Sequence, residues 1–385
     1  MVQYCNPVEV LYGTGSSKQI ATYVNKYSSS NRVLIVSGRK SMREQGIIQR
    51  ISEDLTIENF DVSTYEEIMS NPTIEQIDNA ISFVRKNNFG IIIGLGGGSV
   101  LDSAKIMAIL GNKQRSIKEY LAGNIEIEED GIPFLAIPTT SGTGSEVTMW
   151  ATIWEMSPTI KKKHSLSHKK MYAKIAIIDP SLTIGVSPKQ TAMSGLDALS
   201  QAIEAYWSKN HNPTSDEHAR NAIALIFDSL FDCYTNPDNI VLREKVSLGS
   251  LESGLAFSNT KTTAVHSVSY PLTFHFGVPH GLACALTLGS FLEYNSEICK
   301  DNTKEAPERT LEIAKLLHSD TVIGAKDKIT QLMKKMNLPI RLSELNINDE
   351  GVELIITEAF TEGRIDNNPR KVTKENLKIL LNSII

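Results

Sequence analysis

Residues 91–102 read Ile-Ile-Ile-Gly-Leu-Gly-Gly-Gly-Ser-Val-Leu-Asp, and this stretch decides the fold. The apolar run Ile91 to Ile93 is typical of a buried strand, and the apolar spacing from Leu101 to Leu110 predicts a helix directly after it. Glycines at such a junction let the backbone approach a pyrophosphate, whose charge meets the free N–H groups of the helix start. A tight turn into a helix is the alternative, but it explains Gly96-Gly97-Gly98-Ser99 poorly. The stretch is not G-x-G-x-x-G, the usual Rossmann fingerprint.

The alternation of strands and helices continues on both sides of this stretch. Apolar runs at Val33–Val36, Phe134–Ile137 and Ile175–Ile178 predict further strands, and Ile74–Lys86 has a helical pattern. Such alternation implies an α/β domain with a parallel sheet covered on both faces. After residue 182 strand-like runs become rare. We therefore expect an α/β domain over residues 1–182 and an all-helical domain over residues 183–385, with helices near Gln190–Trp207, Asp216–Asp232, Leu242–Phe257, Leu282–Tyr294 and Glu308–Leu317.

Composition excludes several classes of protein. The chain has 385 residues, 41% of them hydrophobic, which is enough for two domain cores. A net charge of −5 gives no sign of a nucleic-acid or membrane surface. The densest basic run, Lys161 to Lys163 with Lys169 and Lys170, predicts a solvated loop.

The four cysteines and the N-terminus bear on location. The cysteines are scattered without a CxxC pair, which favours reduced thiols over a disulfide framework or a zinc ribbon. The N-terminus shows no signal-peptide pattern, and no apolar run reaches the roughly 18–20 residues of a membrane span. We expect a cytoplasmic protein.

A second polar loop, Pro138-Thr-Thr-Ser-Gly-Thr-Gly-Ser-Glu146, also follows a predicted strand. Its hydroxyls and glycines are suited to line a ribose, a phosphate and a nicotinamide edge, although a merely polar loop is the alternative. The residues expected to contact the nucleotide here are Thr139, Thr140, Ser141, Thr143 and Ser145.

The strand at Val33–Val36 leads into Ser37-Gly38-Arg39-Lys40. In dinucleotide folds an acidic residue after a strand can bind the ribose hydroxyls of NAD. Gly38 supplies no acid, and Arg39 and Lys40 can meet a 2′-phosphate. This favours NADP without forbidding NAD.

Three residues of the second half can bind a metal. Asp197 lies in a helical stretch, with Gln201 at i+4 on the same face, and His266 and His280 follow. One carboxylate and two imidazoles hold a divalent metal and leave a position open for a substrate oxygen. As alternatives to a metal site, Asp197 can cap a helix and the two histidines can simply make hydrogen bonds. Spacing alone does not exclude these roles.

Taken together, these motifs resemble the iron-containing (group III) alcohol dehydrogenase family through nearly the whole chain. The pyrophosphate motif corresponds to Gly96–Ser99 with Asp102 and Lys105, and Pro138–Glu146 matches the PTTSGTGSE loop. The stretch Gly195–Tyr206 matches GxDALxHAxEAY, and Val265-His266, Pro279-His280-Gly281 and Asn368-Pro369-Arg370 match the two histidine motifs and the NPR turn.

The resemblance implies a Rossmann-like nucleotide-binding domain followed by a helical metal-binding domain, the dehydroquinate synthase-like fold, with the active site in the cleft between them. It implies NAD or NADP with Zn²⁺ or Fe²⁺, a small-molecule substrate, and a homodimer or larger homo-oligomer. It also implies that the metal polarises an aldehyde oxygen while the nicotinamide delivers hydride. The catalytic residues are then His266 and His280 as metal ligands, with Tyr270.

Two positions depart from the family pattern. Gln201 stands where members usually have a metal-binding histidine; its side-chain oxygen can ligate, but it is a weaker donor than imidazole. Tyr270 stands one helical turn after His266, where many members have a proton-relaying histidine. Tyr270 can donate a hydrogen bond or a proton, or it can simply line the pocket.

The stretch from Lys261 to Thr273 resembles a narrower branch, the phosphonoacetaldehyde and sulfoacetaldehyde reductases. Lys261 and Arg364 are two cations that can bind an anionic head group, although two surface cations are the alternative. We therefore expect NAD(P)H-linked reduction of sulfoacetaldehyde or phosphonoacetaldehyde. The alternatives are a butanol dehydrogenase-like enzyme for uncharged alcohols, a sugar-phosphate lyase or cyclase on the related fold, and a non-catalytic nucleotide-binding protein whose metal site has decayed at Gln201.

Overall fold

The computed structural model describes residues 3–123, 125–156, 161–361 and 363–385. The chain forms two compact units. The α/β unit comprises Pro7–Thr140 and Gly144–Ile184, and the helical unit comprises Gly185–Ile385, the chain up to Asn6, and Ser141–Thr143. The main boundary thus follows residue 184 rather than 182, because Asp179 ties the turn after it to the α/β unit by accepting hydrogen bonds from Gly15 and Ser17.

A six-stranded parallel sheet forms the centre of the α/β unit, in the order β1-β8-β5-β4-β2-β3. Every residue of β4 and β5 is buried, because helices cover both faces of the sheet. The predicted fold class and these central strands are confirmed. The strands are β1 (Glu9–Tyr12), β2 (Arg32–Gly38), β3 (Asp61–Ile68), β4 (Ile91–Gly96), β5 (Phe134–Pro138) and β8 (Ile175–Ile178).

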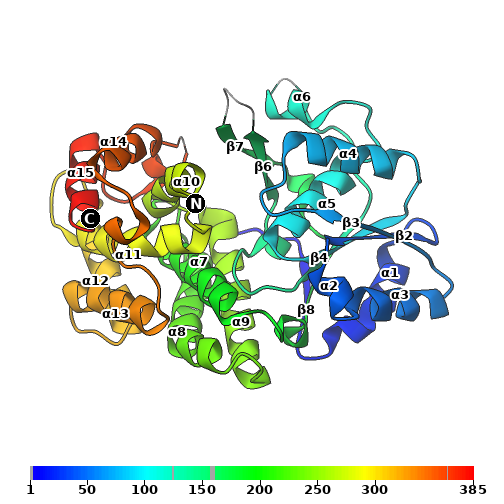
Figure 1. Cartoon of the computed structure of the whole chain (residues 1–385), viewed down its shortest axis with the longest axis horizontal. Helices are drawn as coiled ribbons and strands as arrows, with labels where there is room; N and C mark the ends of the chain where they lie inside the picture. Colours follow the sequence, from blue (N-terminus) through cyan, green and yellow to red (C-terminus); the bar gives the residue numbers. More distant parts are fainter. Residues whose placement is uncertain (1–2, 124, 157–160, 362) are drawn as a thin grey trace. The chain divides into compact units, whose positions relative to one another are not determined.

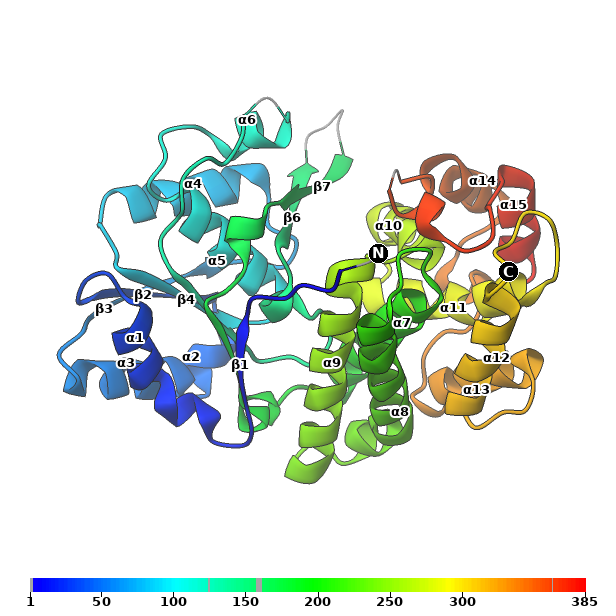
Figure 2. The ribbon, with the colours of Figure 1, turned by 180° about the vertical axis from the view of Figure 1, so that it is seen from behind.

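Alternate residues of the strands pack under different helices. Val33 and Ile35 of β2 pack with α1 (Ile20–Tyr27) and α3 (Ile47–Ile57). Leu34 and Val36 pack with α4 (Ile74–Arg85) and α5 (Gly98–Leu110) on the other face, as Figures 1 and 2 show. The short elements of this unit are η1 (Ser16–Gln19), α2 (Ser41–Glu44), α6 (Ile117–Leu121), η2 (Ser145–Val147), η3 (Lys169–Met171) and η4 (Pro180–Thr183).

The basic run at Lys161–Lys163 was predicted to be a loop, and this prediction is wrong. These residues open β7 (Lys161–Ser167), which pairs antiparallel with β6 (Trp150–Met156). Leu166 of β7 packs beside Ala151 and Ile153 of β6 in an apolar cluster with α5. Pairing with β6 and the packing of Leu166 therefore stabilise the strand in spite of the three lysines at its start.

The helical unit contains no strand within its described residues. Its predicted helices are confirmed, and the central α7 begins with Ser187 capping and Pro188 in the first turn. The elements are α7 (Pro188–Trp207), α8 (Pro213–Thr235), α9 (Ile240–Thr260), α10 (Ala264–Phe276), α11 (His280–Ser296), α12 (Ala306–Leu316), α13 (Val322–Lys335), η5 (Ser343–Leu345), α14 (Asp349–Glu358), η6 (Ile365–Asn367) and α15 (Lys374–Asn382).

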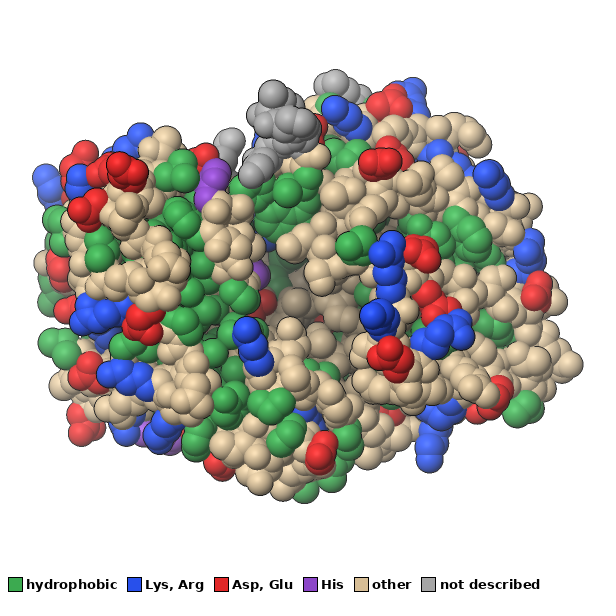
Figure 3. All heavy atoms as spheres, viewed as in Figure 1, with side chains coloured by type: hydrophobic (Ala, Val, Ile, Leu, Met, Phe, Trp, Pro, Cys, Tyr) green, Lys and Arg blue, Asp and Glu red, His purple; other side chains and the backbone are tan. Residues whose placement is uncertain are grey.

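Two surface properties bear on possible partners. Among the described residues, no helix combines the length and the apolar character that a membrane span requires. On the face shown in Figure 3, Lys and Arg side chains are interspersed with Asp and Glu side chains.

Candidate metal centre and nucleotide-binding loops

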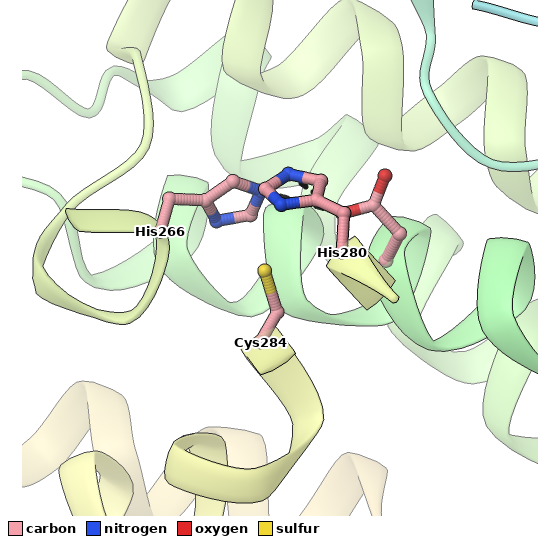
Figure 4. A group of neighbouring side chains, drawn as sticks. His266, His280 and Cys284 are labelled. Carbon is pink, nitrogen blue, oxygen red and sulfur yellow. Dashed lines mark ion pairs between the residues drawn. The ribbon is translucent and has the colours of Figure 1, made fainter. Parts of the chain in front are cut away.

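Four side chains of the helical unit converge on one point. One donor atom from each of Asp197, His266, His280 and Cys284 lies within 4.8 Å of all the others. Asp197, His266 and Cys284 are buried, whereas the side chain of His280 is 33% exposed. Figure 4 shows both imidazole rings and the Cys284 sulfur directed toward one another. The three metal ligands predicted from the sequence therefore lie together, and one side of the cluster is open.

A glycine lets the helices that carry these residues come close enough. Gly281 follows His280 at the start of α11, and a Cβ atom placed on it would lie 1.9 Å from the Met193 carbonyl oxygen and 3.2 Å from the Asp197 Cβ. A larger residue would push α11 away from α7. Gly281 therefore holds His280 beside Asp197.

The two histidines present the same ring nitrogen to Asp197. Nε2 of His266 lies 3.4 Å and Nε2 of His280 lies 3.8 Å from Asp197 Oδ1. The other nitrogen of each ring has its own partner: Nδ1 of His266 pairs with Glu204, and Nδ1 of His280 lies 3.3 Å from Ser269 Oγ. A carboxylate accepting from Nδ1–H keeps the Nε2 lone pair available to a metal.

Charge and hydrogen bonding at this cluster fit a divalent cation. Burial alone would lower the pKa of His266, but Cys284 and Glu204 beside it raise that pKa well above its usual value. Nε2 of His266 is buried without a hydrogen-bond partner among the described residues. A centre that favours positive charge, with an imidazole nitrogen directed into it, suits a metal ion, which would take the place of the proton on that nitrogen.

Gln201 lies beside the cluster and is buried. Its Nε2 amide donates a hydrogen bond to Asp197 Oδ2 at 3.1 Å, and its Oε1 lies 3.4 Å from Ser253 Oγ. The structure thus places this predicted ligand in contact with Asp197, with its amide nitrogen toward the carboxylate.

The sequence analysis missed two residues of this site, Glu204 and Cys284. Glu204 is fully buried and accepts hydrogen bonds from the Thr263 backbone at 2.8 Å and the Thr263 hydroxyl at 2.7 Å, besides its pairing with His266. Its signal is a carboxylate flanked by Ala202-Ile203 and Ala205-Tyr206. The signal for Cys284 is its position four residues after His280, which places both on one face of α11.

The predicted substrate residues lie in the same unit as the metal cluster. The Tyr270 ring stacks on the His280 ring with centroids 6.1 Å apart and an interplanar angle of 11°. The Arg364 guanidinium lies 5.8 Å from the Tyr270 centroid and donates a hydrogen bond to Thr262. Lys261 is exposed at the end of α9 with φ 60°. Arg364 is therefore connected to the metal cluster through Tyr270.

The predicted nucleotide-binding residues of the α/β unit gather at the carboxyl ends of adjacent strands. Gly38 ends β2, Gly96 ends β4, and Thr139 follows β5 and donates to the Gly96 carbonyl at 3.1 Å. The strands β3 and β4 lie on opposite sides of β2, so the strand order reverses at this point. Open α/β sheets bind ligands at such a crevice.

The start of α5 is suited to a pyrophosphate. No side chain caps this helix, and the Val100 and Leu101 N–H groups already donate to the Gly97 carbonyl, so the N–H groups of Gly98 and Ser99 are the ones that can meet an anion. A Cβ on Gly97 would lie 3.1 Å from Thr140 Oγ1. Gly97 therefore keeps open the space between the two loops, where Gly98 and Ser99 continue into the helix.

A buried network joins the two loops beneath this position. Ser145 Oγ donates to Asp102 at 2.6 Å, and the fully buried Lys105 donates to Ser145 Oγ at 2.8 Å and lies 3.5 Å from Asp102. Burial lowers the pKa of Lys105 and raises the pKa of Glu146 to about 7. The hydrogen bonds among Asp102, Lys105 and Ser145 therefore hold the start of α5 and the loop after β5 together.

Other predicted nucleotide contacts have protein partners. Ser141 and Thr143 belong to the helical unit, where Ser141 Oγ lies 2.8 Å from Ser247 Oγ. The exposed Arg39 forms an ion pair with Glu67 at 3.0 Å.

Comparison with known proteins identifies the family. A family model described as iron-containing alcohol dehydrogenase matches residues 7–180, and the model of the C-terminal part of the Fe-containing alcohol dehydrogenase family matches residues 191–385. The chain belongs to the iron-containing alcohol dehydrogenase family. The resemblance seen in its motifs is thereby confirmed.

Relatives within this family have different names. Long-chain-alcohol dehydrogenase 1 of Geobacillus thermodenitrificans is 36% identical over 74% of this chain and 72% of its own length. The NADPH-dependent butanol dehydrogenase of Clostridium saccharobutylicum is 30% identical over 98% of this chain and 96% of its own. The solved structure of sulfoacetaldehyde reductase from Bifidobacterium kashiwanohense in complex with NAD⁺ superposes with a TM-score of 0.91 at 31% identity, covering 100% of this chain and 98% of that one.

As an iron-containing alcohol dehydrogenase, the protein is an NAD(P)-dependent oxidoreductase that binds a metal and acts on a small alcohol or aldehyde.

Proposed function

We propose that this enzyme reduces a small anionic two-carbon aldehyde, sulfoacetaldehyde or phosphonoacetaldehyde, to its alcohol. Asp197, His266 and His280 hold the metal in this proposal, and Lys261 and Arg364 bind the anionic head group. The observation that carries it is the contact of Arg364 with Tyr270, whose ring in turn stacks on His280. An aldehyde of two carbons needs its anion and its carbonyl group to be bound close together.

The chain's own residues prepare this chemistry. Glu204 fixes the tautomer of His266, and Gln201 donates to Asp197, so the donor atoms are oriented before substrate arrives. A metal here would act as a Lewis acid toward the substrate oxygen, and the nicotinamide would supply the hydride. Tyr270 stacks on a metal ligand, where its hydroxyl can donate a hydrogen bond or a proton to the product oxygen.

We propose that the nucleotide is held by Gly96–Ser99 and the loop from Thr139 to Ser145, with Gly38 and Arg39 at the adenosine end. The absence of an acidic side chain at Gly38 favours NADP. Arg39 must then break its ion pair with Glu67 in order to bind the 2′-phosphate. We further propose that the protein is a homo-oligomer and that it is cytoplasmic. The four free cysteines support the cytoplasmic location, because thiols stay reduced there.

An aldehyde panel tests the proposal. Sulfoacetaldehyde, phosphonoacetaldehyde and butanal are each assayed with NADH and NADPH after metal reconstitution. We expect Arg364→Ala to lower kcat/KM for the anionic aldehydes about 10–100-fold, the loss of about 1.5–3 kcal/mol expected for a hydrogen bond to a charged group, and to leave butanal turnover nearly unchanged. Arg341→Ala, which removes an exposed arginine bonded to the Ile385 carbonyl, serves as the control.

The second candidate is reduction of an uncharged short-chain aldehyde. It is favoured by the similarity to the butanol dehydrogenase over nearly the whole chain and by the hydrogen bond that Arg364 already gives to Thr262. A preference for butanal that Arg364→Ala leaves unaltered would establish this alternative.

A further inference from the structure

We propose that Cys284 is the fourth protein ligand of the metal, and that Gln201 positions Asp197 instead of ligating. The shell then consists of one carboxylate, two imidazoles and one thiolate. This inference rests on the metal site proposed above and goes beyond it in assigning a residue and a class of metal.

The first argument is the position of the sulfur. Cys284 Sγ belongs to the group of donor atoms that all lie within 4.8 Å of one another. Cys284 is fully buried, and its sulfur points toward the two imidazole rings (Figure 4). A metal bound by Asp197 and the two histidines would have the sulfur beside it, and metal–ligand distances of about 2.0–2.3 Å would draw the four donor atoms closer together.

The second argument is that the amide of Gln201 is already engaged. A carboxylate can only accept hydrogen bonds, so the end of the amide that faces Asp197 is the NH₂ group. An NH₂ group has no lone pair for a metal. The amide oxygen, which could ligate, lies near the Ser253 hydroxyl instead.

The third argument is charge. Asp197 and a Cys284 thiolate together supply two negative charges within the ligand shell itself, which match a divalent cation, whereas Asp197 with neutral donors alone supplies only one in a largely buried site. On binding, the thiol gives up its proton to solvent and the sulfur lone pair forms the bond to the metal. Thiolate combined with imidazole favours Zn²⁺, which also lies above Fe²⁺ in the general order of affinities.

The test is X-ray absorption of the zinc-loaded protein and the absorption spectrum of its cobalt-substituted form. We expect one sulfur neighbour at about 2.3 Å from zinc and a near-ultraviolet thiolate-to-cobalt charge-transfer band. Cys284→Ala should remove both signals and weaken zinc binding by more than the roughly 10–100-fold typical of a residue outside the ligand shell. Cys233→Ala removes a buried cysteine of α8 and should preserve both signals.

The outcomes separate this inference from the proposed function. A protein that binds one zinc through nitrogen and oxygen alone, or a band that survives in Cys284→Ala, overturns the role of Cys284 and leaves the metal site intact. A protein that binds no zinc or iron overturns the proposed function as well. If Cys284→Ala does not fold, the sulfur neighbour in the unaltered protein still decides the question.

Discussion

The substitution Glu204→Gln should weaken metal binding without unfolding the chain. Glu204 accepts hydrogen bonds with one oxygen, Oε1, from the Thr263 backbone, the Thr263 hydroxyl and the His266 backbone. A glutamine oxygen has two lone pairs and can still accept from the Thr263 backbone and hydroxyl, the two shortest of these bonds. Only the second oxygen changes, and it becomes an NH₂ group facing Nδ1 of His266.

The magnitude follows from the tautomer of His266. An NH₂ group opposite Nδ1–H places two donors against each other, so the ring keeps a hydrogen bond only by moving its proton to Nε2. A protonated Nε2 cannot bind a metal. We therefore expect a loss of about 10–100-fold in zinc affinity, or about 1.4–2.7 kcal/mol, and a metal-free stability reduced by only about 1.5–3 kcal/mol for one charged hydrogen bond.

The assay is competition between the protein and a chelator for zinc, read beside urea denaturation of the metal-free protein. The control is Glu252→Gln, which changes an equivalent pair, His218 Nδ1 with Glu252 at 2.6 Å, away from the cluster. Zinc affinity within threefold of the unaltered protein in Glu204→Gln, or an equal loss in Glu252→Gln, would refute the assignment of Glu204 as the residue that orients His266.

Three further changes test the α/β unit. Glu67→Gln releases Arg39 from its exposed ion pair, which contributes only about 0.2–1 kcal/mol. KM for NADPH should therefore fall up to several-fold, while KM for NADH should not change. Equal shifts in the two KM values would contradict a contact between Arg39 and the 2′-phosphate. The pKa of Glu146 is about 7 in the folded chain against the model-peptide value of 4.5, so the folded state binds the extra proton between these values and stability falls as pH rises from about 4.5 through 7. Between pH 5 and pH 8 the free energy of unfolding, measured with urea, should fall for the unaltered protein by up to about 3 kcal/mol more than for Glu146→Gln. Parallel profiles for the two proteins would contradict this. Gly97→Ala puts a methyl group 3.1 Å from Thr140 Oγ1 and should weaken NADPH binding about tenfold in a fluorescence titration, since overpacking costs about 1–3 kcal/mol; unchanged binding would show that the nucleotide does not use this gap.

Much of the fold could be predicted because its central elements have strong patterns of their own. The strand β4 is a continuous apolar run, buried on both faces, and α7 has its periodicity and its cap in the sequence. The strand β3 was not predicted, because its sequence Asp-Val-Ser-Thr-Tyr-Glu-Glu-Ile has no apolar run and its place at the sheet edge depends on pairing with β2. The strand β7 was not predicted for the same reason: it begins with three lysines, and its extended conformation depends on pairing with β6.

The site could be predicted in part for a related reason. Asp197, His266 and His280 belong to motifs long enough to resemble a family, so their convergence could be expected before any coordinates. Glu204 lay inside one of those motifs, but its role depends on the distance between α7 and the start of α10. Cys284 belongs to no quoted motif, and its one sequence signal is the i, i+4 spacing from His280. Its proximity to His266 depends on how α10 and α11 pack, which spacing within one helix cannot reveal.

The change at Gln201 and the position of Cys284 can be understood together. The family motif places two ligands on one helix at i and i+4, the positions of Asp197 and Gln201 on α7, and takes one ligand each from the two later helices. In our proposal the i, i+4 pair is instead His280 and Cys284 on α11, while α7 and α10 give one ligand each. The number of protein ligands and the number of helices are unchanged, and only the helix that supplies two ligands differs. Gln201 then stabilises the Asp197 carboxylate with its amide, so the position that lost an imidazole still contributes to the site. A glutamine there is consistent with a working metal centre of different donor chemistry, and it does not require that the centre has decayed.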